Sequence, residues 1–195
     1  MKKVLAVFLV LPLMGFAMAD SELGKGFYFP ECQVRLSGPV SWYGYNETQG
    51  GAGIVYVTRE KMIGAESKFL AGVTVYTNME AMTRRPYGDD AADVIFGAMT
   101  AAAQPRRAGK RYWIETPMGR ADSVDFISDS SALSNITYGV VRHPKSTILF
   151  ILEAPRAEWT STLPTLRSII GSLAYAKGPQ KKDEVLSSVF STSKP

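Results

Sequence analysis

The chain has very few of the side chains that metal sites and many enzyme active sites require. Its 195 residues include one cysteine and one histidine. A metal site built from several histidines or cysteines is therefore excluded. An internal disulfide is also excluded, because it needs two cysteines. An apolar core must hold the fold without a covalent cross-link.

Neither of these two residues lies in a recognisable catalytic motif. Cys32 begins a stretch, 32–37, in which apolar and polar residues alternate as in a half-buried strand. We expect a buried, unreactive thiol there, with an intermolecular disulfide as the alternative. His143 precedes a proline, so we expect an exposed turn residue. No G-x-S-x-G motif accompanies it, and the glycine-rich stretch 50–53 lacks the Gly-Lys-Ser/Thr of a phosphate-binding loop.

A cluster of acidic residues precedes a predicted helix over 91–103. Asp89, Asp90 and Asp93 could form an acid–base pair for hydrolysis. Carboxylates in the first turn of a helix also complement the helix dipole, and we favour this structural role.

A second group of acidic residues is a candidate calcium site. Asp122, Asp125 and Asp129 follow one another closely in the sequence. Calcium needs several oxygen ligands gathered in one loop. Asp122 and Asp125 lie at odd spacing on a predicted strand, so they should face opposite sides of it. We therefore predict no metal site and no cofactor.

The charge balance argues against a nucleic-acid-binding protein. The net charge is +4, and it falls to +2 without Lys2 and Lys3, which is too small for nucleic acid. Two basic clusters, Arg84–Arg85 and Arg106–Arg107, flank the predicted helix over 91–103. They could bind an acidic protein partner or anionic lipid headgroups, although solvated loop charge is the ordinary interpretation.

The aromatic cluster Trp42, Tyr43 and Tyr45 is the other candidate binding surface. Tyrosine, tryptophan and arginine are enriched at the energetic centres of protein interfaces. We expect core or edge packing for at least two of these three side chains.

The first 19 residues have the pattern of a secretory signal peptide. Lys2 and Lys3 precede an apolar stretch, 4–16, and the small residues Ala17 and Ala19 fit a cleavage site. A membrane anchor is the alternative, but the apolar stretch is shorter than the roughly 20 residues that a span requires. We predict a periplasmic or secreted domain over 20–176 with no remaining span. A polar tail over 177–195 should be disordered.

The mature chain shows a run of strands interrupted by two helices. Predicted strands are 32–37, 54–58, 69–76, 110–116, 121–127, 136–142 and 147–152, with 40–45 as an edge strand or packed loop and 46–53 as a turn. A capping box over 77–80 and the helix over 91–103 follow the early strands, and a helix capped by Thr162 covers 162–173. The expected buried stripes are Val94, Ile95, Ala98, Met99 and Ala102 on the first helix and Leu163, Leu166, Ile169, Ile170 and Leu173 on the last. The apolar run at 148–152 indicates a central strand covered on both sides, or one with a helix on one face and a loop on the other. This order indicates an α+β fold, with an antiparallel sheet of about six to seven strands packed against two main helices.

This arrangement resembles the PsbP-like fold, which bacterial envelope domains share. The matching parts are the entry segment 27–30 with Trp42, the helix at 90–103 and the strand–linker–helix ending at 147–173. The resemblance implies a non-enzymatic accessory or binding role. It provides no shared active site, so no residue role is carried over.

The sequence therefore predicts an exported accessory protein that binds another envelope protein. One specific form is an immunity-type protein that neutralises a periplasmic toxin. The alternatives are a small-molecule or lipid carrier and, with less support, a hydrolase.

Overall fold

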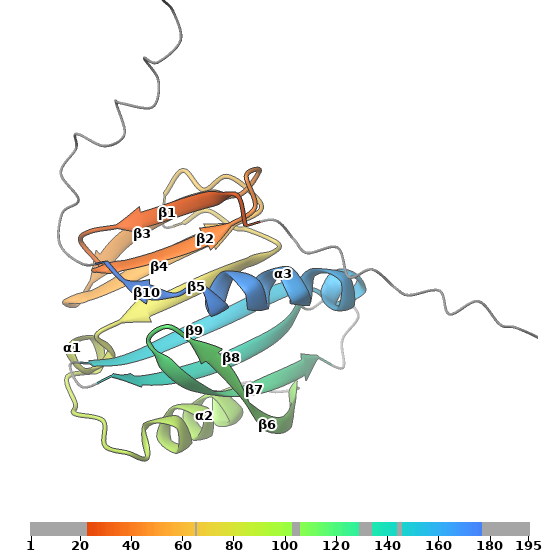
Figure 1. Ribbon diagram of the computed structural model, residues 1–195. Helices are drawn as coiled ribbons and strands as arrows, with labels where there is room; N and C mark the ends of the chain where they lie inside the picture. The colour runs from red at the N-terminus through yellow and green to blue at the C-terminus, as the bar shows by residue number, and fades with distance from the viewer. Residues whose placement is uncertain (1–22, 65, 103–105, 129–133, 144–145, 177–195) are drawn as a thin grey trace, which may run out of the picture.

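The computed structural model describes residues 23–64, 66–102, 106–128, 134–143 and 146–176 (Figure 1). The predicted signal peptide over 1–19 and the predicted tail over 177–195 lie outside these residues. Among the described residues, no helix is both long and apolar enough to cross a membrane.

Two antiparallel sheets form the framework, and the α+β class is confirmed. The large sheet has seven strands in the order β3 (Tyr43–Gln49), β4 (Ala52–Thr58), β5 (Gly72–Thr77), β9 (Ser146–Pro155), β8 (Ser134–His143), β7 (Gly119–Ser128) and β6 (Arg106–Thr116). The small sheet has the order β1 (Lys25–Phe29), β2 (Val34–Gly38) and β10 (Ala174–Tyr175). The helical elements are α1 (Met79–Thr83), α2 (Ala91–Ala102), η1 (Arg156–Glu158) and α3 (Trp159–Gly171).

Strand β9 is the middle strand of the large sheet and is covered on both faces. Ile148, Phe150 and Leu152 are completely buried on one face. Leu149 is buried on the other, because successive side chains of a strand point to opposite faces. The continuous apolar run at 148–152 had predicted such a doubly covered strand, and this prediction is confirmed.

Each face of the large sheet carries its own apolar core. The first core lies under α3 and the small sheet, and the second lies under α2. Figure 1 shows α3 lying across β5 and β9, with the small sheet beside it. On α3, the predicted stripe of Leu166, Ile169 and Ile170, with Leu173 just beyond, is completely buried.

Helix α2 forms where predicted, but its buried face coincides only in part with the predicted stripe: Ile95 is buried and Met99 packs against the second core. Ala91, Ile95 and Phe96 are buried, whereas the predicted core residue Ala98 is exposed. The face that includes Phe96 removes more apolar area from water than the alanine face. This explains why the helix is rotated about its axis relative to the predicted orientation.

The expected turn over 46–53 is much shorter in the structure. β3 continues through Gln49 and pairs with Ala52 of β4, which leaves a two-residue hairpin loop. Gly50 and Gly51 have φ values of 59° and 86°, a conformation that glycine adopts without a steric penalty. The polar residues of β3 gave the segment its turn-like composition.

The predicted capping box at Thr77 is wrong. Thr77 ends β5 and donates its hydroxyl to the carbonyl of Gly53. α1 begins at Met79 after Asn78, which adopts a left-handed conformation and makes no side-chain cap. The Glu80 carboxylate that was expected to complete the box binds β9 instead.

The start of the last helix was also placed too late. α3 begins at Trp159, directly after η1, so Thr162 lies within the helix and does not cap it. Pro164 is inside α3 and exposed. The preceding 3₁₀ turn supplies the helix start that the sequence analysis had assigned to Thr162.

Gly139→Ala tests the close packing at the centre of the sheet. Gly139 pairs with Phe150 of β9, and a Cβ at position 139 would overlap the Phe150 ring. We expect the free energy of unfolding, measured by urea denaturation, to fall by about 1–3 kcal/mol. Gly97→Ala in α2 is the control: nothing lies within 4 Å of its Cβ position, so it should stabilise by about 0.5–1 kcal/mol. Equal stability of Gly139→Ala and the parent chain would contradict this packing.

Candidate binding surfaces

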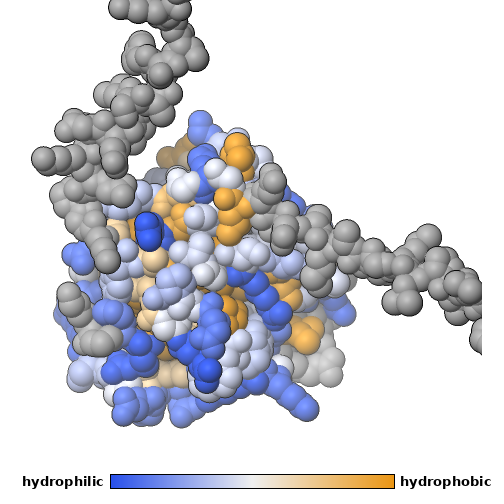
Figure 2. All heavy atoms as spheres, viewed as in Figure 1, coloured by the Kyte–Doolittle hydropathy of each residue, from blue (hydrophilic) through white to orange (hydrophobic). Residues whose placement is uncertain are grey.

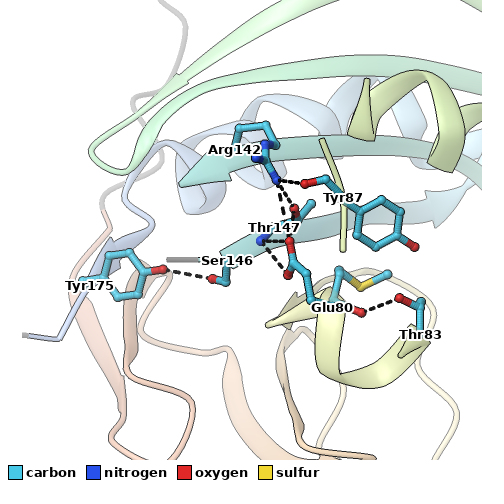
Figure 3. A network of polar contacts seen from close by, with 8 residues as sticks. Glu80, Thr83, Tyr87, Arg142, Ser146, Thr147 and Tyr175 are labelled. Atoms are coloured by element: carbon cyan, nitrogen blue, oxygen red, sulfur yellow. Dashed lines mark hydrogen bonds and ion pairs between the residues drawn. The ribbon is translucent and has the colours of Figure 1, made fainter. Parts of the chain in front are cut away.

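A polar network centred on Glu80 joins α1 to the β8–β9 hairpin (Figure 3). The two carboxylate oxygens of Glu80 accept the Thr147 backbone N–H at 3.0 and 2.9 Å, and one of them accepts the Thr147 hydroxyl at 2.5 Å. Arg142 donates to the Thr147 hydroxyl at 2.8 Å and to the Tyr87 carbonyl at 2.9 Å, and its Nη1 lies 3.6 Å from Glu80 Oε1.

The protonation of Glu80 fits a structural role. Partial burial alone would raise the pKa of Glu80, but the hydrogen bonds from Thr147 and the charge of Arg142 outweigh burial and lower the pKa. A carboxylate held ionised by its hydrogen bonds is poorly suited to general acid–base work. This cluster links α1 to β9.

The predicted aromatic cluster is divided between core and surface. Trp42 is only 6% exposed and belongs to the first core, so its role as an exposed binding residue is wrong. Tyr43 is 42% exposed at the start of β3. Tyr45 is half-buried and packs against Tyr56 with ring centroids 5.9 Å apart. Trp42 precedes β3, whereas Tyr43 and Tyr45 lie on this edge strand.

The two basic clusters lie at opposite ends of α2 in the sequence. Arg84 and Arg85 are exposed after α1, and Arg85 lies over the Tyr87 ring. Arg106 and Arg107 open β6, where they pair with Ser128 and Ile127. Their side chains are outside the described part of the structure, so a shared basic surface stays a prediction.

The acidic residues do not converge on one site. Asp93 forms an ion pair with Arg111, which also lies 3.5 Å from Asp122. Asp89 and Asp90 are exposed in the preceding turn. All three side chains are exposed, and Asp93 lies in the first turn of α2.

The calcium hypothesis also finds no cluster. Asp125 accepts hydrogen bonds from the hydroxyls of Tyr112 and Thr137. Asp122 instead lies near Arg111. Asp129 lies outside the described residues. Within those residues, no three histidine, cysteine, aspartate or glutamate side chains gather as metal ligands do.

His143 is packed against another side chain, so the predicted exposed turn is wrong. It is the last residue of β8 and half-buried, with its ring centroid 4.4 Å from that of Tyr175. Tyr175 reaches this position because β10 pairs with β2. The pairing joins residues far apart in the sequence, which a local turn pattern cannot reveal.

Cys32 is a buried free thiol, as predicted. Its side chain is 4% exposed. Burial, and then the nearby Glu31 carboxylate, raises the pKa of the thiol. A thiol that is buried and protonated is a poor nucleophile, and this argues against the intermolecular disulfide.

Two adjoining hollows form a groove that sequence reasoning did not find. One has a volume of about 420 Å³ and the other about 500 Å³. Both are lined by Tyr28 and Arg35 of the small sheet, by Ala174 of β10, and by Pro117 in the turn between β6 and β7. His143 and Tyr175 close one end. The only sequence signal was that Arg35 occupies a polar position of an alternating strand.

The fold defines an α+β protein with two antiparallel sheets. No protein-family model matches the chain, and no curated protein matches it in sequence. Among solved structures, the chain is similar to the solution structure of cyanobacterial PsbP (CyanoP) from Synechocystis sp. PCC 6803, with 12% identity and a TM-score of 0.49. The similarity covers 77% of this chain and 91% of that chain. No residue role is taken from this likeness.

Glu80→Gln tests the network of Figure 3. We expect the free energy of unfolding at pH 7 to fall by about 1–3 kcal/mol, because the variant weakens charge-assisted hydrogen bonds to buried Thr147. The folded-state pKa of Glu80 is lowered, so its contribution is complete above the ordinary glutamate pKa of 4.5 and is lost as pH falls further. The parent and variant should therefore converge in acid denaturation curves.

Glu115→Gln is the matched control for this measurement. The Glu115 side chain is 72% exposed, with a surface ion pair to Arg120. Its replacement should change stability by less than about 0.5 kcal/mol. A Glu80→Gln effect that is as small as this, or that is independent of pH, would contradict the stabilising role of the network.

Proposed function

We propose that this protein is an exported, non-enzymatic accessory protein that binds another envelope protein at the free edge of its large sheet. The signal-peptide pattern of residues 1–19 supports export. The observation that carries the binding proposal is the geometry of β3. In the described sheet, this edge strand hydrogen-bonds to β4 alone.

An edge strand presents backbone N–H and C=O groups that another chain can pair with. Adding a strand from a partner is an established mode of peptide and protein recognition. Proteins that avoid such pairing commonly place charged residues, especially lysine, or proline on the edge. β3 contains no lysine or proline, and its one charged residue, Glu47, accepts a hydrogen bond from Tyr56 of β4. Strand β3 therefore has the properties of a docking edge.

Exposed side chains beside β3 add to this surface. Tyr43 is 42% exposed and Val40 is 71% exposed. The Lys25 ammonium lies 5.9 Å from the centre of the Tyr43 ring. An aromatic and an aliphatic side chain next to a free edge supply side-chain contacts for a paired strand.

An immunity-type protein that neutralises a periplasmic toxin is one specific form of this proposal. The support is the signal-peptide pattern of a small chain, together with the structural partners of Asp93 and His143. Arg84, Arg85, Arg106 and Arg107 stay a separate candidate surface for an acidic partner, because β6, which begins with Arg106 and Arg107, is the opposite edge of the sheet from β3. The identity of the bound protein decides between an immunity role and an assembly role.

Tyr43→Ala tests the docking edge. A tagged chain is used to capture proteins from envelope extracts of its own host. We expect one stoichiometric partner with the parent chain and its loss with Tyr43→Ala, because truncating an aromatic residue at the centre of an interface commonly costs about 2 kcal/mol or more. Trp113→Ala is the control: Trp113 is 59% exposed on β6, the opposite edge of the same sheet.

Two results would count against the proposal. One is the absence of any stoichiometric partner, and the other is equal loss of the partner in both variants. The intact mass of the tagged chain recovered in the same experiment tests export. It should correspond to a chain that begins near Asp20, whereas retention of residues 1–19 would contradict cleavage.

A further inference from the structure

The groove beside the small sheet contains Arg35, a cation for which the described residues provide no counterion. Arg35 is exposed in the middle strand of the small sheet, where it pairs with Tyr28 of β1 and Ala174 of β10. Within the described part of the chain, the Arg35 side chain makes no ion pair, side-chain hydrogen bond or ring contact. Arg111, Arg120 and Arg142, in contrast, are each paired with carboxylates.

The residues around Arg35 leave its charge unneutralised. No aspartate or glutamate is among the described residues that line the two hollows. A guanidinium in a concave surface without acidic neighbours attracts an anion, and its planar array of donors matches a carboxylate.

The remainder of the groove offers apolar surface. Pro117 and Tyr28 line both hollows, and Met118 lines one of them. Figure 1 shows β10 and the β6–β7 hairpin on the same side of the large sheet as α3. In Figure 2 hydrophobic residues on this side form small patches among hydrophilic ones, which fits a small ligand better than a broad protein interface.

The size of the hollows also favours a small molecule. Volumes of about 420 and 500 Å³ lie within the range of roughly 300–1,000 Å³ found for small-molecule sites. His143 and Tyr175 line one hollow, and Ser37 and Ser172 line the other. A ligand could therefore place an apolar body along the walls and its anionic group at Arg35.

We propose that this groove binds a small amphipathic carboxylate, with Arg35 as the partner of the carboxylate and Tyr28, Pro117 and Met118 in contact with the apolar body. The site is separate from the β3 edge, so it does not depend on the protein-binding proposal. It would give the protein a carrier or sensing activity.

Competition binding tests the site on the chain purified as its host produces it. The fluorescent probe is 8-anilinonaphthalene-1-sulfonate, an amphipathic monoanion, and the competitors are octanoate and neutral octanol. We expect octanoate to displace the probe at lower concentration than octanol. Arg35→Gln should weaken octanoate binding about tenfold, as loss of a charged hydrogen-bond partner commonly does. The same variant should leave the binding of octanol nearly unchanged.

Two further variants separate the groove from general surface effects. Arg84→Gln removes an exposed arginine after α1 and should leave octanoate binding unchanged. Ala174→Phe fills the groove from β10 and should weaken both competitors, with circular dichroism and thermal unfolding used to verify folding. If Ala174→Phe does not fold, the Arg35→Gln and Arg84→Gln comparison decides alone.

Several outcomes would overturn the proposal. These are the absence of saturable probe binding, equal affinity for octanoate and octanol, and equal weakening by Arg35→Gln and Arg84→Gln. Tyr43→Ala should leave octanoate binding unchanged. Failure of one proposal is therefore distinguishable from failure of the other.

Discussion

The burial of β9 on both faces is the constraint on which the rest of this structure depends. A strand without a polar face needs cover on both sides. Ile148, Phe150 and Leu152 are covered from the α3 side, and Leu149 is covered from the α2 side. The two helices and the small sheet therefore occupy fixed sides of the large sheet. This apolar packing holds the fold without a disulfide bond.

The same arrangement determines where the free surfaces lie. α3 returns the chain across the first face, and β10 then pairs with β2. This pairing brings Tyr175 against His143 and places Ala174 beside Arg35, which builds the groove. The position of β9 in the middle of the sheet leaves β3 and β6 as the edges. The groove and the β3 edge, the two proposed binding sites, therefore both follow from the same arrangement of strands.

Strong local patterns made much of this fold predictable. The apolar run at 148–152 indicated the central strand, and the stripe ending at Leu173 indicated the buried face of α3. Predictions failed where a distant contact overrode a local one: Glu80 binds Thr147 in β9 and does not cap a helix, and His143 packs on Tyr175. The groove was not predictable, because it joins β1, β2, β10 and the β6–β7 turn, which are distant in sequence.

Residue-resolved hydrogen exchange under native conditions tests the central role of β9 most directly. The amides of Leu149, Phe150 and Ile151 should exchange only through global unfolding, with opening free energies equal to the unfolding free energy from denaturation. The amides of the free edge β3 should exchange through much smaller openings. Exchange of the β9 amides by local opening, or protection of β3 equal to that of β9, would contradict this account.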